Sequence, residues 1–399
     1  MLFPSVGAFH MTDAQSGYLL LADISGYTVF LSDSELEHAR DTLTDLLTLL
    51  IDQTKSPLIV SKLEGDAVFS YTWGEEPFKD GQALAELIEN TYVAFRRAIE
   101  LMVMNNTCQC AACANVSNLD LKFFVHHGTF AQHVLVRQVE LVGPDVNLVH
   151  RLMKNGVKER TGISAYTLYT EAAVRGLGIE GIAQTMTAQV ESVDQLGDVQ
   201  LWVQDMHPVW ERRRNEHAVV FEPSMTTAVD IGLPPEVVWR YLRQPTYRSM
   251  IQGGRVAAET NKAGRIGPES QFQCYHGKNV LTQRIVEWTP FERIVSQDTE
   301  TMPLMNKLTW KNEYRLVPTE GGTRLTISMG HFEGPWLARK SITSLLSKGS
   351  SQFQGRIRAF AAAAEADWAE QQTSADAAPA IVLTAESIRD AAASSLKVF

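Results

Sequence analysis

Two aspartates in the first part of the chain stand where apolar segments end, in positions suited to a metal ion. Asp23 closes the run YLLLAD, and Asp66 follows a glycine in KLEGDAVF. An apolar run can be buried as a strand and still present its last residue at the rim of a sheet. Carboxylates at such a rim suit Mg²⁺, which takes oxygen ligands and usually keeps water and substrate phosphate in its shell. The two residues therefore predict a site for a divalent cation.

The segment after Asp23 suits a phosphate group. It reads ISGYT from Ile24 to Thr28 and leads into a stretch that we expect to be helical. Gly26 permits a tight turn and a close approach of the backbone, and the first N–H groups of a helix favour an anion. We expect Gly26, Tyr27 and Thr28 to line this turn. Taken alone, however, Asp23 could be only the N-cap of the helix.

A third segment combines an amide with a guanidinium. A short expected strand is broken at Gly143 and Pro144, and a helix is expected to follow. Asn147 and Arg151 are four residues apart, so they share one face of that helix. A planar guanidinium beside an amide suits a phosphoryl group and a ribose. The alternative is that both residues lie on a solvated helix face.

In their order and spacing, these three segments resemble the class III nucleotidyl cyclase homology domain. The resemblance covers about residues 15–205 and includes the stretch VHHG between the second and third segments. It implies a ferredoxin-like α/β fold. The sequence contains no GxxxxGK[ST] motif, so a Walker-type phosphate loop is not expected.

The resemblance gives each matching position a role. It implies that Asp23, the carbonyl group of Ile24 and Asp66 bind two metal ions, either Mg²⁺ or Mn²⁺. Lys62 matches the lysine that selects the base in the purine pocket. Glu140 stands where adenylate cyclases of this family usually have an aspartate.

The same resemblance implies a composite site. Asn147 matches the asparagine that orients the ribose, and Arg151 matches the arginine that stabilises the transition state. In the family the metal pair comes from one protomer and the other groups from its partner, so a head-to-tail homodimer is expected. The reaction would be an in-line attack of the ribose 3′-oxygen on the α-phosphorus, with pyrophosphate leaving and two metals assisting.

The two residues of the purine pocket favour ATP as the substrate and cyclic AMP as the product. Lys62 can donate to a ring nitrogen, and Glu140 can accept from an exocyclic amine, which matches adenine. Guanine would present a carbonyl group to Glu140 and leave a buried charge unpaired.

One departure from the family pattern opens a second interpretation. The family usually places a lysine near the domain's end to hold the terminal phosphates, but residues 190–202 contain neither Lys nor Arg. The alternative is therefore a catalytically degenerate cyclase-like domain, which would serve as a nucleotide-binding or dimerisation module.

Three cysteines lie close together between the second and third segments. Cys108, Cys110 and Cys113 form a C-x-C-x-x-C pattern, which is not a standard zinc pair. A Zn²⁺ site would need a further ligand, such as a nearby histidine. We favour the alternative of reduced thiols in a loop, which suits a reducing compartment.

The second half of the chain resembles the START-like (SRPBCC, polyketide cyclase-like) helix-grip fold over about residues 220–370. A strand at about 226–231 leads into a helix with proline in its first turn, several extended segments follow, and a long helix is expected at about 335–371. The motifs that carry the resemblance are DIGLPPEVVW, VEWTP and YRLVPTEGGTRL. They imply an antiparallel sheet with a long C-terminal helix.

The helix-grip fold implies a cavity between sheet and helix that takes an apolar small molecule. We expect His276 and Glu287 to be its polar handles. Core filling is an equally good explanation for each lining candidate, and an enzyme acting on a polyketide-like substrate is a third possibility. The lining candidates are Phe272, Tyr275, Trp288, Met302, Met305, Trp310 and Met329.

Composition limits the remaining classes. The chain has 399 residues and a net charge of −10, which argues for two or three domains and against a nucleic-acid partner. It has no apolar run of about 18 residues, so no membrane span is expected. The N-terminus lacks the pattern of a signal peptide, so we expect a cytoplasmic protein.

The predicted fold class is α+β, with a ferredoxin-like α/β domain followed by a helix-grip domain. A ligand of the second domain would regulate the first. The expected divisions are a flexible leader (1–14), the cyclase homology domain (15–205), a polar linker (206–217), the START-like domain (218–371) and a tail (372–399).

Overall fold

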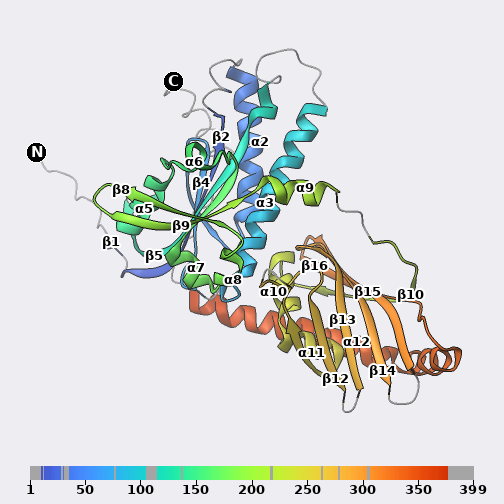
Figure 1. Ribbon diagram of the computed structural model, residues 1–399. Helices are drawn as coiled ribbons and strands as arrows, with labels where there is room; N and C mark the ends of the chain where they lie inside the picture. The colour runs from blue at the N-terminus through green and yellow to red at the C-terminus, as the bar shows by residue number, and fades with distance from the viewer. Residues whose placement is uncertain are drawn as a thin grey trace, which may run out of the picture. The chain divides into compact units, whose positions relative to one another are not determined.

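The structure of the protein is a computed structural model, and its described residues form two compact units (Figure 1). Unit 1 comprises Met1–Glu216 together with Ala375–Phe399, and unit 2 comprises His217–Ser374. Each unit mixes helices with one main sheet, so the chain is α+β as predicted. The structure describes residues 10–11, 13–27, 30, 36–75, 78–104, 115–135, 138–215, 219–261, 264–276, 279–302 and 306–375.

Unit 1 is built on a sheet of nine strands with the main order β3-β4-β2-β5-β7-β9-β8, and β1 and β6 also pair with β5. The β5–β7 pair is parallel, and the other pairs are antiparallel. The strands are β1 (His10–Met11), β2 (Gln15–Ser25), β3 (Ile59–Glu64), β4 (Ala67–Tyr71), β5 (Asp120–Leu135), β6 (Gln138–Val142), β7 (Tyr166–Thr170), β8 (Thr187–Val193) and β9 (Gly197–Asp205).

Helices cover this sheet, and α2 runs beside α3 (Figure 1). The helices are α2 (Leu36–Thr54), α3 (Gln82–Met104), η2 (Val116–Asn118), α5 (Pro144–Leu152), α6 (Val157–Thr161), α7 (Glu171–Leu177), α8 (Glu180–Ala183) and α9 (His207–Asn215).

The sheet face that carries Leu19 and Leu21 is covered by α5, whose Val149 and Leu152 belong to the same core cluster. Successive side chains of a strand alternate between faces. Asp23 therefore lies on the face that α5 covers, two residues beyond Leu21. The strand that contributes Leu19 and Leu21 to the apolar core of unit 1 therefore also positions the carboxylate of Asp23 at the edge of that core.

Two stretches of unit 1 differ from the sequence-based prediction. His10–Met11, expected in a flexible leader, pairs with β5 as strand β1. The expected linker 206–217 contains helix α9, which packs on α3 and buries Val209 and Trp210. Arg212 and Arg214 of this polar helix also form ion pairs with Glu89 and Glu100 of α3.

Unit 2 contains one antiparallel sheet with the order β10-β16-β15-β14-β13-β12-β11 and a long C-terminal helix, as predicted. Its strands are β10 (Pro223–Ile231), β11 (Arg255–Glu259), β12 (Gln271–His276), β13 (Asn279–Thr289), β14 (Arg293–Met302), β15 (Asn306–Thr319) and β16 (Gly322–Gly330). Its helices are α10 (Pro235–Arg243), α11 (Pro245–Gln252) and α12 (Trp336–Ala375).

The core of unit 2 joins the helices to the sheet. Trp239 of α10 is fully buried and meets the ring of Trp288 at 4.7 Å between centroids. Ile357 and Phe360 of α12 are buried as well. The apolar faces of α10 and α12 therefore pack toward the sheet, as is typical of amphipathic helices.

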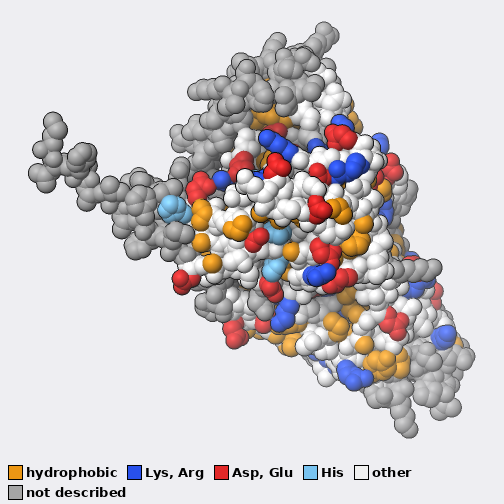
Figure 2. Space-filling model, turned by 60° about the vertical axis from the view of Figure 1, so that its left-hand side comes forward, with side chains coloured by type: hydrophobic (Ala, Val, Ile, Leu, Met, Phe, Trp, Pro, Cys, Tyr) orange, Lys and Arg blue, Asp and Glu red, His pale blue; other side chains and the backbone are white. Residues whose placement is uncertain are grey.

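The described part of the chain contains no helix that is long and apolar enough to span a membrane. On the face drawn in Figure 2, acidic and basic side chains are interspersed, and the described side chains form no broad basic patch there.

Candidate functional site

Asp23 lies on strand β2 of the unit 1 sheet, and Asp66 lies in a turn beside it. Asp23 pairs with Ala67 on β4 and with Lys122 on β5. Asp66 occupies the tight turn between β3 and β4, and its carbonyl oxygen accepts a hydrogen bond from the Ile24 N–H at 3.2 Å. The two aspartates thus come together as predicted, but Asp66 stands in a hairpin turn instead of closing a strand.

The surroundings of the two carboxylates disfavour their negative charges. Burial, together with the charge of Asp23, raises the pKa of Asp66 from its ordinary 3.8 to about 7. Burial also raises the pKa of Asp23, and the positive charge of Lys122 opposes that shift. A proton or a bound cation would offset both the poor solvation and the mutual repulsion of these carboxylates.

The oxygen atoms of the two aspartates suit a metal ion whose remaining ligands come from water and substrate. No group of three or more His, Cys, Asp or Glu side chains that could hold a metal exists among the described residues. Mg²⁺ sites in phosphoryl-transfer enzymes need only one or two carboxylates, since water and phosphate supply the rest. Asp23 and Asp66 satisfy that requirement, with the Ile24 carbonyl as a further oxygen in this segment.

The turn after Asp23 is packed against the protein's own backbone. A Cβ atom on Gly26 would lie 2.8 Å from the Asn118 carbonyl oxygen, and its φ of +86° also favours glycine. Tyr27 is buried, and burial together with the charge of Asp66 raises the pKa of its hydroxyl group. Gly26 is therefore explained by packing alone, and Thr28 lies outside the described residues.

Lys62 and Glu140 come together, although 78 positions separate them in the chain. The Lys62 Nζ atom lies 3.1 Å from Glu140 Oε2 and 2.8 Å from Glu64 Oε1. Burial alone lowers the pKa of Lys62, but its hydrogen bonds to Glu64 and Glu140 outweigh that effect and raise it. The lysine is thus held charged between two carboxylates.

Glu64 is a member of this cluster that the sequence analysis missed. Its Oε2 atom lies 3.0 Å from Nδ1 of His150 on α5. Burial alone raises the pKa of Glu64, whereas the hydrogen bonds from His150 and Lys62 lower it. The available signal was the spacing of Lys62 and Glu64, because residues two apart on a strand share a face.

Asn147 and Arg151 are exposed on the outer side of α5, whereas Val149 and Leu152 are buried. The Arg151 Nη1 atom donates to the carbonyl oxygen of Asp194, in the turn between β8 and β9. Within the described residues, no hydrogen bond or ion pair joins Arg151 to Asp23 or Asp66. The structure brings Asp23 close to Asp66, and Lys62 close to Glu140. It does not bring Asn147 or Arg151 to the two aspartates.

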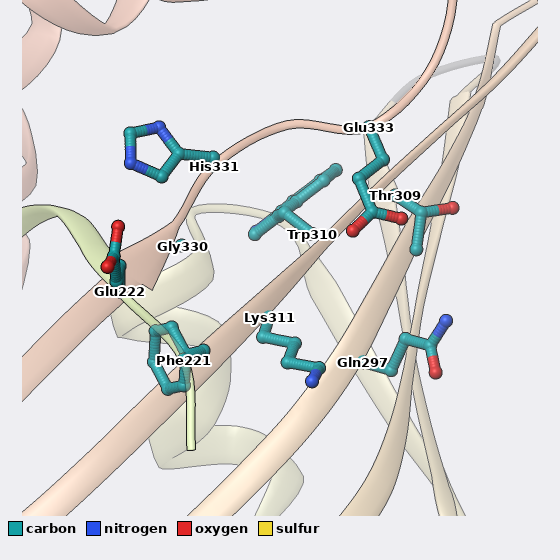
Figure 3. A pocket seen from close by; sticks show the side chains of 9 residues that line it. All are labelled: Phe221, Glu222, Gln297, Thr309, Trp310, Lys311, Gly330, His331 and Glu333. Atoms are coloured by element: carbon teal, nitrogen blue, oxygen red, sulfur yellow. The ribbon is translucent and has the colours of Figure 1, made fainter. Parts of the chain in front are cut away.

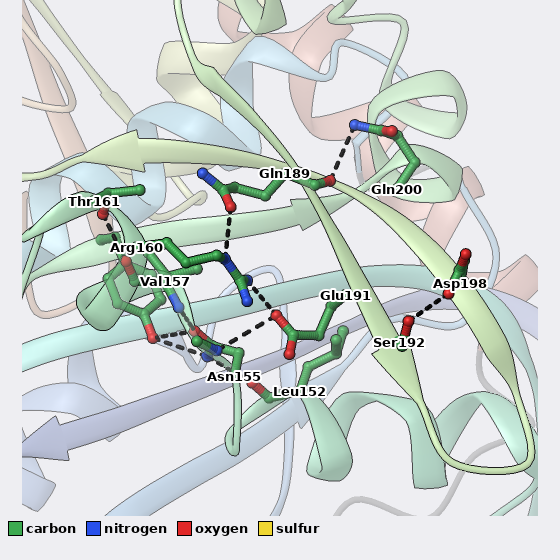
Figure 4. Close-up of polar contacts among 12 residues, drawn as sticks. Leu152, Asn155, Val157, Arg160, Thr161, Gln189, Glu191, Ser192, Asp198 and Gln200 are labelled. Carbon is green, nitrogen blue, oxygen red and sulfur yellow. Dashed lines mark hydrogen bonds and ion pairs between the residues drawn. The ribbon is translucent and has the colours of Figure 1, made fainter.

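The C-terminal end of α5 is anchored by a polar network (Figure 4). The Asn155 side-chain amide donates to the Leu152 carbonyl at 2.7 Å and to the Tyr166 hydroxyl at 2.8 Å. Arg160 on α6 forms an ion pair with Glu191 on β8. These contacts hold α5 in register with the edge hairpin of the sheet.

The N-terminal end of α5 is tied to β5. Asp145 accepts a hydrogen bond from the Thr129 N–H at 2.6 Å, and its Oδ1 atom lies 3.2 Å from His126 Nε2. His126 Nδ1 is in turn 2.8 Å from the Thr170 hydroxyl group. The hydrogen bond from His126 is the main reason that the pKa of Asp145 is lowered.

The edge hairpin lacks the basic residue that the cyclase pattern would place there. Neither β8 nor β9 contains Lys or Arg. The cysteines of the predicted zinc site, Cys108, Cys110 and Cys113, lie outside the described residues, so that site stays a prediction.

The polar handles expected in unit 2 both have partners within the chain. Glu287 is bound to Arg293 at 2.7 Å and accepts the Val219 N–H. His276 Nε2 lies 2.7 Å from the Cys274 sulfur. Their role as handles for a ligand stays a prediction.

The lining candidates of unit 2 also differ among themselves. Phe272, Trp288 and Trp310 are buried, whereas Tyr275 is 37% exposed. Met305 and the side chain of Met302 lie outside the described part.

A pocket of about 200 Å³ opens on unit 2 (Figure 3). Trp310 and Lys311 lie between its two ends, one with His331 and the other with Gln297 (Figure 3). Of the predicted lining candidates, only Trp310 contributes to this pocket. The residues around it are Phe221, Glu222, Gln297, Thr309, Trp310, Lys311, Gly330, His331 and Glu333.

Family models match both units. Residues 222–365 match the family described as polyketide cyclase / dehydrase and lipid transport, so unit 2 is a domain of the SRPBCC-like kind that was predicted. Residues 43–161 match a family described as a protein of unknown function (DUF2652). The match in unit 1 is thus to an uncharacterized family and not to a class III cyclase family.

A curated relative defines the family. The chain is 30% identical over 170 residues to the uncharacterized protein Rv2561/Rv2562 of Mycobacterium tuberculosis, covering 42% of this chain and 76% of that protein. The chain therefore belongs to the same family as this mycobacterial protein.

Solved structures with partial similarity include an adenylyl cyclase and a protein from a structural survey. The adenylyl cyclase CyaB from P. aeruginosa is 14% identical, with 49% of this chain and 96% of that chain covered and a TM-score of 0.35. Protein MLL2253 from Mesorhizobium loti is 17% identical, with 34% and 94% covered and a TM-score of 0.28. At such TM-scores neither similarity carries an argument about activity.

Proposed function

We propose that the protein is a nucleotidyl cyclase that converts ATP to cyclic AMP and pyrophosphate. The observation that carries the proposal is the proximity of Asp23 on β2 and Asp66 in the neighbouring β3–β4 turn, two poorly solvated carboxylates. Lys122 partly compensates the charge of Asp23, whereas the charge of Asp23 raises the pKa of Asp66. Perturbed carboxylates of this kind are typical of functional sites.

In this proposal Asp23, Asp66 and the Ile24 carbonyl hold two Mg²⁺ or Mn²⁺ ions with the triphosphate. When bound, the metal supplies positive charge that acidifies the ribose 3′-hydroxyl and neutralises the leaving pyrophosphate. Gly26 and Tyr27 follow these residues in the chain and would lie beside the bound triphosphate.

Lys62 and Glu140 would bind the adenine edge. Their side chains lie 3.1 Å apart, so a donor and an acceptor stand side by side. Adenine offers a ring nitrogen that accepts and an amine that donates, which complements this pair. The carboxylate of Glu64 keeps Lys62 charged and oriented toward Glu140.

Asn147 and Arg151 would serve the site of a second copy of the chain. Both are exposed on α5, and exposure leaves them accessible to a partner. Asn147 would orient the ribose, and Arg151 would meet the charge that grows on the phosphate oxygens as the bond breaks. The assembly is a head-to-tail homodimer with two equivalent sites.

A second candidate function is nucleotide binding without turnover. Two observations favour it: β8 and β9 lack a basic residue for the terminal phosphates, and Arg151 donates to a carbonyl oxygen of its own chain. In that case unit 1 would be a dimerisation or sensing module attached to a small-molecule-binding domain.

Unit 2 would bind a small apolar molecule and bias the cyclase reaction. Its support is the SRPBCC-like family match and the apolar core around Trp239 and Trp288. A cytoplasmic location belongs to the same proposal, since it gives the site access to ATP. A turnover that stays constant across a panel of apolar ligands would count against this regulation.

The test is the conversion of ATP by the full-length protein with Mn²⁺, followed by chromatography of the nucleotides. Cyclic AMP should form with the wild type and with Arg175→Ala, a control at a highly exposed surface arginine. Asp66→Asn and Arg151→Ala should abolish it. Nucleotide binding without product in the wild type would support the second candidate and overturn the cyclase proposal.

A further inference from the structure

A group of polar side chains is buried on one face of the unit 2 sheet. Gln283, Asp298 and Trp310 stand opposite one another on β13, β14 and β15, and opposed residues share a face. Gln283 and Asp298 have no exposed surface, and Trp310 is 7% exposed. Burying polar groups costs free energy unless they are hydrogen-bonded, so each polar atom of this cluster is expected to have a partner.

Asp298 is satisfied by neutral donors. Its Oδ2 atom accepts from Gln283 Nε2 at 2.7 Å and from Asn312 Nδ2 at 2.6 Å, and its Oδ1 atom accepts from the Ser296 hydroxyl at 2.6 Å. Burial raises the pKa of Asp298. This carboxyl group is therefore occupied by side chains that carry no charge.

Arg248 on α11 lies beside this cluster and is fully buried. Its guanidinium carbon lies 4.2 Å from the ring centroid of Phe272 and 4.6 Å from that of Tyr314. Its Nε atom is 3.4 Å from Gln283 Oε1, and its Nη1 atom is 3.3 Å from the Leu242 carbonyl. Both hydrogen bonds are long and both acceptors are neutral.

The third nitrogen of this guanidinium has no partner. No hydrogen-bond acceptor for Arg248 Nη2 exists among the residues that the structure describes. Two further buried atoms of the same cluster, Asn312 Oδ1 and Trp310 Nε1, are also unpartnered in the described part of unit 2. An unpaired buried polar atom costs about 1–3 kcal/mol, and more when it is charged.

The carboxylates of the long helix of unit 2 are engaged elsewhere. Residues 336–364, which form most of α12, contain no Asp or Glu but five Lys and Arg residues. Further along α12, Glu365 accepts from the Gly232 N–H and Asp367 accepts from the Tyr241 hydroxyl group. Among the described residues no ion pair joins Asp298 to Arg248; the amide of Gln283 links them, and the charge of Arg248 only partly offsets the effect of burial on the pKa of Asp298. Because Arg248 Nη2 still lacks an acceptor among these residues, an acceptor from outside the chain would complete the site.

We propose that Arg248 binds the carboxylate of an amphipathic small acid whose apolar body packs within unit 2. This inference rests on the proposal above that unit 2 takes an apolar ligand, and it adds the chemistry of the head group. The carboxylate accepts from Nη2, while the flanking rings of Phe272 and Tyr314 fix the plane of the guanidinium. A carboxylate forms a stronger, charge-assisted hydrogen bond with a guanidinium than a neutral head group does.

The test compares decanoate with decanol by isothermal titration into the full-length protein. The two probes share an apolar chain and differ in the head group. Hydrogen bonds to charged groups are worth more than neutral ones, so decanoate should bind about tenfold or more tightly than decanol. Equal affinities would overturn the carboxylate assignment alone, whereas no binding of either probe would overturn the wider ligand-binding proposal as well.

Variants locate the effect. Arg248→Met keeps an apolar stem between the rings and should abolish the preference for decanoate while decanol binding is kept. Arg255→Met is the matched control, because Arg255 lies over the ring of Tyr275 on the surface of the same unit. If Arg248→Met does not fold, the double variant with Asp298→Asn removes both buried charges together. A preference for decanoate that survives in the folded variant would contradict the inference.

Discussion

At the residue scale, the central feature of unit 1 is a pair of carboxylates, Asp23 and Asp66, whose charged forms are disfavoured by burial and, for Asp66, by the charge of its neighbour. The sequence predicted that Asp23 and Asp66 would meet, because both follow apolar runs that must be strands. It could not predict Glu64 or His150 as neighbours of Lys62, since their contact depends on how α5 packs on the sheet. Buried Arg248 was missed for the same reason: an isolated arginine in a helix looks like any surface residue.

The raised pKa of Asp66 predicts a pH-dependent stability. Between about pH 4 and the folded-state pKa of about 7, the folded chain holds this proton more tightly than the unfolded chain. The free energy of unfolding should therefore fall as the pH rises through that window. In EDTA, Asp66→Asn should be more stable than wild type at pH 8 by about 2–4 kcal/mol, because each pKa unit is worth about 1.4 kcal/mol.

Urea denaturation at pH 5 and pH 8 measures this difference. At pH 5, only about one unit into that window, the variant should be more stable than the wild type by only about 1.5 kcal/mol. Mn²⁺ should raise the stability of the wild type alone at pH 8. An unchanged wild-type stability across this range would show that Asp66 titrates normally and is not confined with Asp23.

The purine preference is a second prediction at this scale. Exchanging the charges with Lys62→Glu and Glu140→Lys presents an acceptor to the ring N–H of guanine and a donor to its carbonyl group. The ratio of kcat/KM for ATP over GTP should fall by about 100-fold or more. Steady-state assays with both nucleotides measure it, and an unaltered ratio would place the base elsewhere.

At the element scale, α5 is held at both ends, by Asp145 with His126 and by Asn155 with its neighbours. The start of α5 was predictable from Gly143 and Pro144, because proline suits the first turn of a helix. Its tethers were not, since they join positions far apart in the sequence. Helix α9 was not predicted, because its sequence is mostly polar and only Val209 and Trp210 are buried.

The hairpin between β15 and β16 allows a sharp test of packing in unit 2. A Cβ atom on Gly322 would lie 2.2 Å from the Ile231 carbonyl oxygen, and its φ of +143° is strained for other residues. A Cβ atom on the neighbouring Gly321 would meet no other atom within 4 Å. Gly322→Ala should therefore destabilise unit 2 by about 2 kcal/mol or more, and Gly321→Ala should have little effect.

Thermal unfolding followed by tryptophan fluorescence compares these two variants. Most of the strands of unit 2 were predictable from alternation and turn residues, including this hairpin from its paired glycines. Equal melting temperatures for Gly322→Ala and Gly321→Ala would show that the turn is not closed against β10.

At the scale of the whole molecule, the proposed enzyme joins an SRPBCC-like domain to a unit whose site is complete only in a dimer. Asp23 and Asp66 are assigned to one protomer, and Arg151 to the other. The fold of each unit follows from local patterns, but the pairing of two chains does not, because the exposed face of α5 carries no apolar signal that specifies a partner. The assembly must therefore be tested through function.

Mixing two inactive variants tests this claim most directly. Asp66→Asn and Arg151→Ala each remove one half of the composite site, so each alone should be inactive as a homodimer. An equal mixture forms mixed dimers in half of the population, and each of these keeps one intact site. We predict recovery of about a quarter of the wild-type rate of cyclic AMP formation after mixing. A mixture that stays inactive, although the two variants exchange subunits and the wild type is active, would contradict the account.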